Sequence, residues 1–330
     1  MRHQHLLLRP LHQLALVAAA LILGGCAANH EWPEKREGSG ARPEHRTLED
    51  IPFHAQDAYQ CGPAALSTML NARDIPATPD ELVDRVYLPE RGGTLQVEMV
   101  SAARERGLLV YPLEGSLDAL MQEIAAGNPV LVMQNLALEW WPQWHFAVVI
   151  GYDREASEVI LHTDTRRAHA EPMRPFMNSW KRADYWARVM VPPDQLPATA
   201  QPLPWLSAAS DLEATGQLEA ARRAYKTALT EWPDEPAPRF GLGNVAYAMD
   251  RPGPALTHFQ QLTRTHPQMA PAWNNLTVLL SEQGCAIAAR RVHDCARKTL
   301  GDEAELPERP ALRETRRATT ACPIIRCPER

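Results

Sequence analysis

The chain has 330 residues, of which 45% are hydrophobic and 22% are charged. This length is sufficient for two domains that each bury a core of their own. The formal net charge is −6 at pH 7. Because nucleic-acid-binding proteins usually carry a basic excess, this charge argues against that class of protein.

The first 25 residues are typical of an export signal. Arg2 and Arg9 precede the apolar run LALVAAALILGG, residues 14–25, which is too short to span a bilayer stably. The run ends in LGGC, the pattern of a bacterial lipobox, so we expect Cys26 to be lipidated. Ala27 follows, as in lipoproteins sorted to the outer membrane. These features predict a lipid-anchored protein of the bacterial cell envelope, at the periplasmic face of the outer membrane; the alternative is a cleaved signal with an incidental cysteine.

A flexible tether and a mixed domain are predicted after the signal. Residues 26–50 are polar and rich in glycine, proline and charge, which is typical of a tether. Residues 51–193 contain helical patterns first and short β-branched runs afterwards, and this order predicts an α+β domain. The expected helices are residues 61–72, 94–108 and 116–127, with Gly127 as a C-cap, and the expected strands are residues 129–136, 145–153 and 157–164.

A 34-residue period dominates the second half of the chain. The proline-rich stretch from Pro192 to Pro204 predicts a linker, residues 194–201, that leaves the two domains separable. Beyond it, Ala221, Ala255 and Ala289 are spaced by 34 residues, as are Tyr225 and Phe259. This period resembles the tetratricopeptide repeat and predicts three units over residues 202–300, with a groove for a protein partner. A plain helical bundle is the alternative, and residues 301–330 read as an irregular tail.

Six cysteines are present. If Cys26 is lipidated and Cys61 stays a thiol, four remain near the C-terminus, and these permit three pairings. An oxidising periplasm favours one or two structural disulfides among them. A zinc site that includes His293 is the alternative, although no C-x₂-C spacing supports it. The four cysteines are Cys285, Cys295, Cys322 and Cys327.

The stretch QDAYQCGPAALSTML places Cys61 where a helix is expected to begin. A helix N-terminus lowers the pKa of a thiol, and Pro63 is tolerated in a first helical turn. Gly62 beside the sulfur would let a substrate backbone come close. The pattern therefore indicates a reactive thiol, with a buried structural cysteine as the alternative.

Candidates for a base, an acid and an oxyanion donor follow from the same pattern. His145 opens one predicted strand and Asp164 closes the next. If Gly151 pairs with Glu158 across a hairpin, His145 lies opposite Asp164, as a Cys-His-Asp triad requires. Gln56 precedes Cys61 on a loop from which its amide could stabilise an oxyanion.

The segments PFHAQDAYQCGPAAL and HFAVVIGYD resemble the bacteriocin-processing, double-glycine leader peptidase family of papain-like cysteine peptidases. The chain is most similar to its stand-alone, exported branch with tetratricopeptide repeats. This resemblance implies an α+β papain-like cysteine peptidase domain followed by an all-α tetratricopeptide-repeat solenoid. It also implies that Cys61 is the nucleophile, His145 the general base, Asp164 the orienting acid and Gln56 the oxyanion-hole amide. No cofactor or metal is implied.

Two departures from the family pattern keep other functions open. Gln56 lies five residues before the cysteine instead of six, and Asp164 is followed by Thr165 instead of proline. We therefore weigh a membrane-anchored cysteine peptidase, whose repeats recruit a protein substrate or partner, against a catalytically silent peptide-binding scaffold. Acyl transfer or isopeptide chemistry by the same triad is a third hypothesis.

Several other residues have ordinary explanations. Trp140, Trp141 and Trp144 either line a substrate cleft or pack beneath a core strand. His54 and His162 are expected to be structural. Asp153 lies where a turn follows its strand, and aspartate is common in turns whether or not it takes part in catalysis.

Overall fold

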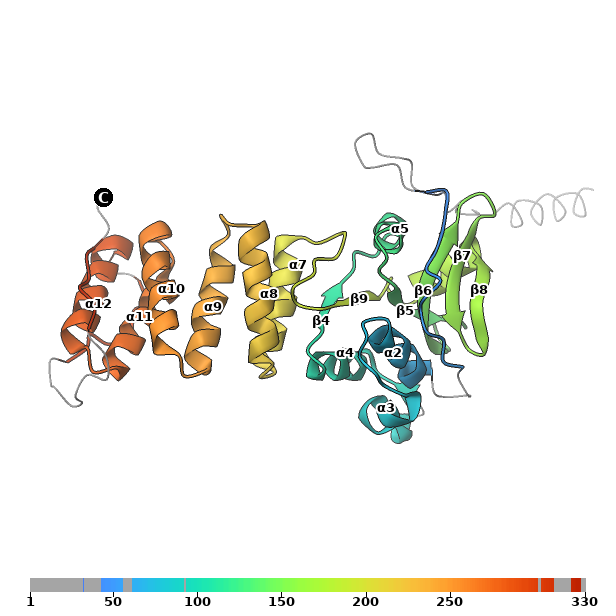
Figure 1. Ribbon diagram of the computed structural model, residues 1–330, viewed down its shortest axis with the longest axis horizontal. Coiled ribbons are helices and arrows are strands. Elements are labelled where there is room, and N and C mark those ends of the chain that lie inside the picture. Colours follow the sequence, from blue (N-terminus) through green and yellow to red (C-terminus); the bar gives the residue numbers. More distant parts are fainter. Residues whose placement is uncertain are drawn as a thin grey trace, which may run out of the picture.

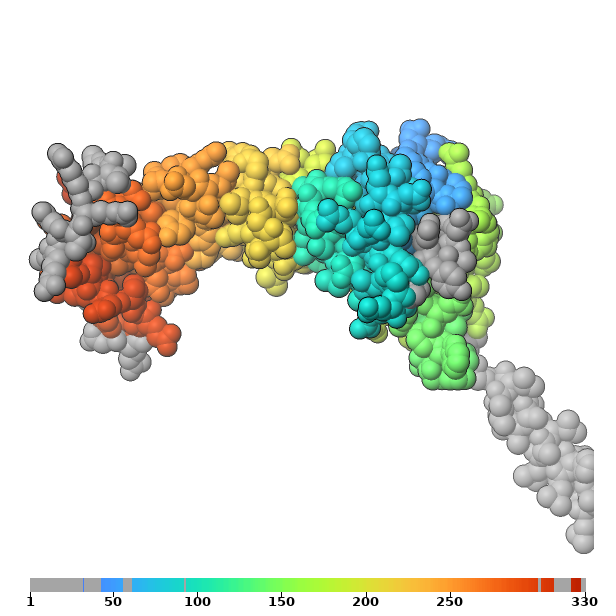
Figure 2. Space-filling view, turned by 90° about the horizontal axis from the view of Figure 1, so that it is seen from below, coloured from blue at the N-terminus to red at the C-terminus, as the bar shows by residue number. Residues whose placement is uncertain are grey.

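The computed structural model describes residues 32, 43–55, 61–91, 93–301, 304–311 and 322–327. The predicted signal peptide, Cys26 and Gln56 lie outside these residues. Figure 1 shows an elongated molecule in which a domain containing a β-sheet is followed by a row of helices. Figure 2 shows the same succession from a second direction.

The first domain is built on a seven-stranded antiparallel sheet. Six strands follow the order β4-β9-β5-β6-β7-β8, and β1 pairs with the last three residues of β6, 151–153. The central strands β5, β6 and β7 are almost entirely buried, in agreement with the apolar run that each of them contains. The strands are β1 His45–Thr47, β4 Leu109–Pro112, β5 Val130–Asn135, β6 Trp144–Asp153, β7 Glu158–Thr163, β8 Arg166–Pro172 and β9 Ala187–Val191.

In the described residues, five α-helices accompany this sheet. Nine residues of α2 are buried, on all sides of the helix, so it forms the centre of the domain. Thr78 and Glu81 form a capping box at the start of α3, and Gly127 follows α5 with φ 91°, as expected for a C-cap. The helices are α2 Cys61–Asn71, α3 Pro79–Val86, α4 Gln96–Glu105, α5 Leu117–Ala125 and α6 Met173–Lys181. The predicted α+β class is confirmed.

A short two-stranded sheet lies outside the main one. Its strands are β2 Tyr87–Leu88 and β3 Gly93–Thr94, joined through a 3-10 turn at Pro89–Arg91. This ribbon was not predicted from the sequence, nor were α3, α6, β4, β8 and β9. The predicted tether, residues 26–50, is corrected at its end, because β1 lies within it and pairs with β6.

The second half of the chain forms six helices in three antiparallel pairs. They are α7 Pro202–Ala214, α8 Leu218–Glu231, α9 Pro236–Ala248, α10 Pro252–Thr265, α11 Ala270–Glu282 and α12 Ala286–Leu300. Ala221, Ala255 and Ala289, the residues of the 34-residue period, are all fully buried. At Gly241 a Cβ atom would lie 2.3 Å from the ring of Tyr225, so only glycine allows this helix crossing. The predicted repeat architecture is confirmed.

The segment between the two halves is docked, contrary to the prediction of a loose linker. Glu123, which is fully buried in α5, accepts hydrogen bonds from the backbone N–H and the hydroxyl of Thr199, at 2.7 and 2.6 Å. The Tyr111 hydroxyl donates to the Thr199 carbonyl at 3.0 Å. One continuous hydrophobic core runs from Leu48 into the first repeat and includes Trp205. The first repeat is therefore packed against the sheet domain.

Two disulfides attach the C-terminal segment to the last repeat. Cys285 pairs with Cys322, and Cys295 pairs with Cys327. This arrangement confirms the expectation of structural disulfides and excludes a zinc site made of these thiolates. The described parts of the tail, residues 304–311 and 322–327, contain neither helix nor strand, as predicted.

Candidate active site

Cys61 is the first residue of α2, as the sequence predicts, and it is the one free cysteine of the described residues. Its side chain lies close to the backbone N–H of Phe146, the residue after His145 in β6. Burial raises the pKa of the Cys61 thiol, and the N–H groups of Phe146 and Gly62 only partly oppose this effect. The expectation of a lowered thiol pKa is therefore wrong, because desolvation outweighs the helix N-terminus.

Gly62 has a packing function that the sequence did not reveal. A Cβ atom at this position would lie 2.3 Å from the Thr94 hydroxyl oxygen and 2.5 Å from its Cβ atom. The small β2–β3 ribbon therefore fits directly against the start of α2. Since Thr94 occupies the space above Gly62, the glycine serves this contact and not the approach of a substrate backbone.

His145 lies in β6 and is almost completely buried. Its Nε2 atom is 2.7 Å from the Thr163 hydroxyl oxygen and 3.6 Å from Asp164 Oδ1. Burial lowers the pKa of His145, and the Asp164 carboxylate opposes that shift. The imidazole therefore stays neutral over a wider pH range than an exposed histidine, and its Nε2 edge faces Thr163 and Asp164.

The strand register that was expected to join His145 to Asp164 is wrong. Gly151 pairs with Ile160 instead of Glu158, and Glu158 pairs with Asp153. The difference begins at the turn, where Asp153 and Glu158 are already paired, and a bulge between Val149 and Gly151 changes the pairing again; periodicity alone reveals neither. The two side chains nevertheless meet, because β7 ends at Thr163 and the turn that follows directs Asp164 toward the histidine.

Asp164 lies on an exposed turn between β7 and β8. Its backbone has φ 47°, a left-handed conformation that aspartate tolerates better than most residues. Its side chain is 48% exposed and accepts a hydrogen bond of 2.9 Å from Arg166 Nη2. Asp164 is thus shared between His145 and Arg166. Sequence reasoning missed Thr163 and Arg166, although their positions beside Asp164 were the available signal.

The remaining histidines and Asp153 have the structural environments expected of them. Both nitrogens of His162 are engaged: Nε2 donates to the Ile51 carbonyl at 3.1 Å, and Nδ1 accepts from the Ala168 N–H at 3.0 Å. His54 Nε2 lies 2.9 Å from the Asn71 side-chain amide. Asp153 accepts from the Ala156 N–H in its turn. Gln56 lies outside the described residues, so its predicted role stays a prediction.

A groove of about 370 Å³ is lined by neighbours of Cys61 and His145 but by neither residue itself. It contains Thr94, which touches Gly62, and Trp144, which precedes His145. Trp144 is 50% exposed, whereas Trp140 and Trp141 are 77% and 72% exposed and lie outside the groove lining. Packing beneath the core strand is therefore excluded for all three. The complete lining is Thr94, Leu95, Gln96, Met133, Trp144, Ala183, Asp184 and Trp186.

The described part of the chain also limits other kinds of site. No group of three or more His, Cys, Asp and Glu side chains in it could hold a metal ion. None of the helices described is long and apolar enough to cross a membrane. The Cys61, His145 and Asp164 side chains supply a thiol, an imidazole and a carboxylate, which suit nucleophilic catalysis with general acid–base assistance.

Comparisons with known proteins show what the two halves of the chain are similar to. Among solved structures, a similar chain from Bacillus anthracis is described as a candidate C39-like peptidase. The match has 18% sequence identity and a TM-score of 0.40, and it covers 45% of this chain and 98% of that one. No curated protein matches this chain. Residues 48–187 match the model of the peptidase C39-like family, and residues 212–280 match a tetratricopeptide-repeat model. The resemblance predicted from the sequence is confirmed: the chain carries a peptidase C39-like domain followed by tetratricopeptide repeats.

Proposed function

We propose that this protein is a cysteine peptidase in which Cys61 is the nucleophile, His145 the general base and Asp164 the orienting acid. The observation that carries the proposal is the position of the thiol. Cys61 begins α2 against the Phe146 backbone, while the neighbouring His145 directs its Nε2 edge at Thr163 and Asp164. The opposite ring nitrogen, Nδ1, then remains to accept the thiol proton.

The pKa directions predict how the reaction starts. Because burial raises the pKa of Cys61 and lowers that of His145, both groups are neutral in the free protein. The thiol therefore transfers its proton to Nδ1 as the sulfur attacks the substrate carbonyl carbon. The resulting imidazolium gives this proton to the leaving amine, and a thioester forms at Cys61. Water, deprotonated by the same imidazole, then hydrolyses the thioester and regenerates the thiol.

Thr163 and Asp164 have complementary functions in this scheme. Thr163 Oγ1, at 2.7 Å from Nε2, fixes the orientation of the ring. Asp164, at 3.6 Å, stabilises the positive charge that the ring acquires. The negative charge on the substrate oxygen needs donors as well, and the Gln56 amide together with the N–H groups at the start of α2 is our proposal for them.

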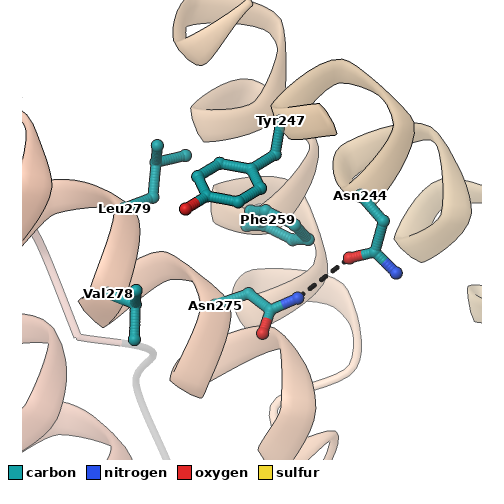
Figure 3. A pocket seen from close by; sticks show the side chains of 6 residues that line it. All are labelled: Asn244, Tyr247, Phe259, Asn275, Val278 and Leu279. Atoms are coloured by element: carbon teal, nitrogen blue, oxygen red, sulfur yellow. Dashed lines mark hydrogen bonds between the residues drawn. The ribbon is translucent and has the colours of Figure 1, made fainter. Parts of the chain in front are cut away.

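The repeats are proposed to bind a protein substrate or a partner complex. A pocket of about 120 Å³ lies between α9, α10 and α11 (Figure 3). Phe259, Val278 and Leu279 provide apolar walls, and the Asn275 amide donates to Asn244 Oδ1 at 2.9 Å. Such a pocket suits one apolar side chain of an extended peptide.

The proposed location is the periplasmic face of the outer membrane, with Cys26 as the lipid anchor. The lipobox-like sequence LGGC motivates this proposal, and the two disulfides are consistent with an oxidising compartment. Replacing Cys26 by serine should move the protein from the membrane fraction to the soluble fraction. Unchanged fractionation of this variant would contradict the lipid anchor.

The test of peptidase activity is a comparison of wild type with Cys61→Ala on a complex peptide mixture. We expect the wild-type protein to generate new peptide termini, identified by mass spectrometry, and Cys61→Ala to generate none. Trp140→Ala, which changes an exposed residue outside the groove lining, is the control and should cleave like wild type. If wild type and Cys61→Ala leave the mixture equally intact, the domain is a silent peptide-binding scaffold and the proposal is wrong.

A further inference from the structure

The groove beside Cys61 has a shape and a charge that restrict the substrate. We propose that it binds a lysine or arginine side chain of the substrate, close to the bond that is cleaved, and that Asp184 selects the positive charge. This inference rests on the proposed peptidase function and specifies its substrate class.

The groove is connected to the proposed catalytic residues from both sides. On the helical side, Thr94 lies directly against Gly62, the neighbour of Cys61. On the sheet side, Met133 pairs with Phe146, and Trp144 precedes His145 in the same strand. The groove therefore lies within reach of a peptide that presents its carbonyl group to Cys61.

The dimensions of the groove indicate a long side chain. Its volume of about 370 Å³ is within the range of about 300–1,000 Å³ that is typical of ligand sites. A glycine would leave this space filled only by water. Leu95, Met133, Trp144 and Trp186 provide apolar surface along it. The methylene stem of a lysine or arginine is suited to such walls, because it is apolar over most of its length.

One aromatic wall is held rigidly in place. The Trp186 ring has an edge-to-face contact with Phe146, at 5.7 Å between centroids. The guanidinium of Arg188 stacks at 4.7 Å from the Trp186 centroid, and it also donates to the Ala187 carbonyl. Arg188 thus belongs to the support of the wall, whereas the partly exposed Trp144 offers its ring to a bound side chain.

The charge of the groove selects among long side chains. Of its eight lining residues, Asp184 is the one that carries a charge. Asp184 is exposed and has φ 50°, and Tyr185 after it has φ 53°. These two consecutive left-handed residues place the aspartate at the rim of the groove. A carboxylate at the end of an apolar channel is complementary to a side chain with an apolar stem and a cationic end.

The test is a library of internally quenched octapeptides in which every position is varied, with cleavage sites located by mass spectrometry. We expect wild type to favour Lys or Arg over Leu and Gly at one position within two residues of the cleaved bond. Asp184→Asn should reduce the preference for Lys and Arg over Leu on the order of tenfold. Asparagine also tolerates the left-handed conformation, so this variant removes the charge and keeps the turn.

Matched controls separate the groove from general effects. Asp74→Asn makes the same change at another exposed, left-handed aspartate (φ 57°), beyond the opposite end of α2, and should leave the preference unchanged. Trp144→Ala should weaken the selection of long side chains over glycine, whereas Trp140→Ala should not.

The outcomes distinguish this inference from the function on which it rests. Two results would overturn the inference and leave the peptidase function intact. One is a wild-type preference for glycine beside the cleaved bond. The other is a preference for Arg over Leu that is the same in wild type and in Asp184→Asn. An absence of any cleavage, while iodoacetamide still alkylates Cys61 in the folded protein, would overturn both.

Discussion

The two halves of the chain bring their important side chains together in different ways. In the first domain, Cys61, His145 and Asp164 come from a helix, a strand and a turn, and the sheet joins them. In the repeats, Trp273 and Ala289 lie in helices of the same pair, and their core is separate from that of the first domain. Changes within the outer repeats should therefore have local effects, whereas changes that reach the shared core should alter the site as well.

The largest effect should come from the catalytic pair itself. Cys61→Ala and His145→Ala should each reduce peptide hydrolysis on the order of 10³-fold or more, because nucleophile and base act as a unit. The double variant should be no worse than either single variant. Initial rates on a peptide cleaved by wild type measure this prediction. Additive losses would show that the two residues act independently.

The next effect tests whether the first repeat belongs to the core of the first domain. Trp205 and Trp273 are buried tryptophans in the first helices of the first and third repeats, but they lie in different core clusters. Replacing either by alanine should cost about 3–5 kcal/mol locally. Only Trp205→Ala should also increase hydrogen exchange in the central strands β5 and β6.

Equal exchange of those strands in the two tryptophan variants would contradict the shared core. The same reasoning applies to truncation after Pro193, which would expose the apolar surface that α7 covers. We expect the truncated domain to be less stable than the whole protein, in contrast to the separable domains that the proline-rich linker sequence suggested.

A smaller effect is expected from the disulfides. Double replacement of Cys285 and Cys322 by serine should lower the free energy of unfolding of the last repeat by about 2–4 kcal/mol. Denaturant unfolding followed by hydrogen exchange of α11 and α12 measures this change. Peptidase activity under mild conditions should stay at the wild-type level, since these residues contact the outer core only. A fall in peptidase activity that accompanies the fall in stability would show that the last repeat stabilises the catalytic site.

The smallest effect concerns Asp164, which is exposed and shared with Arg166. Asp164→Asn should reduce kcat/KM on the order of tenfold, less than the loss of His145. The carboxylate raises the pKa of His145 against the lowering caused by burial, so its removal should lower that pKa further. Activity is lost at acid pH when this imidazole becomes protonated. We expect this loss of activity below about pH 6.5 in wild type and at a still lower pH in Asp164→Asn. A shift to higher pH would contradict this assignment.

The sequence analysis succeeded where the structure depends on local patterns. The helix that begins at Cys61, the strand that begins near His145 and the 34-residue period were all predicted, because periodicity and capping residues indicate such elements directly. The predicted contact of His145 with Asp164 was found, but through a different register. The turn closes at the pair Asp153 and Glu158, and a bulge follows between Val149 and Gly151; no local pattern indicates either feature.

Other features of the site depended on contacts between distant residues. Gly62 is small because Thr94 lies against it, and the thiol pKa is raised because α2 is buried beneath other elements. The docking of residues 198 and 199 depends on Glu123, an acidic residue whose burial no sequence pattern suggested. The pairing of the four C-terminal cysteines likewise depends on where residues 322–327 lie relative to α12, which no local sequence pattern indicates.

The most direct test of the central claim is detection of the thioester at Cys61. Wild-type protein is mixed with a peptide that it cleaves, quenched in acid within milliseconds to seconds, and examined by intact-mass and peptide mass spectrometry. The account predicts a covalent adduct on Cys61 with the mass of the acyl half of the substrate, absent from Cys61→Ala. Continued cleavage of the peptide by Cys61→Ala, or an adduct on another residue, would contradict it.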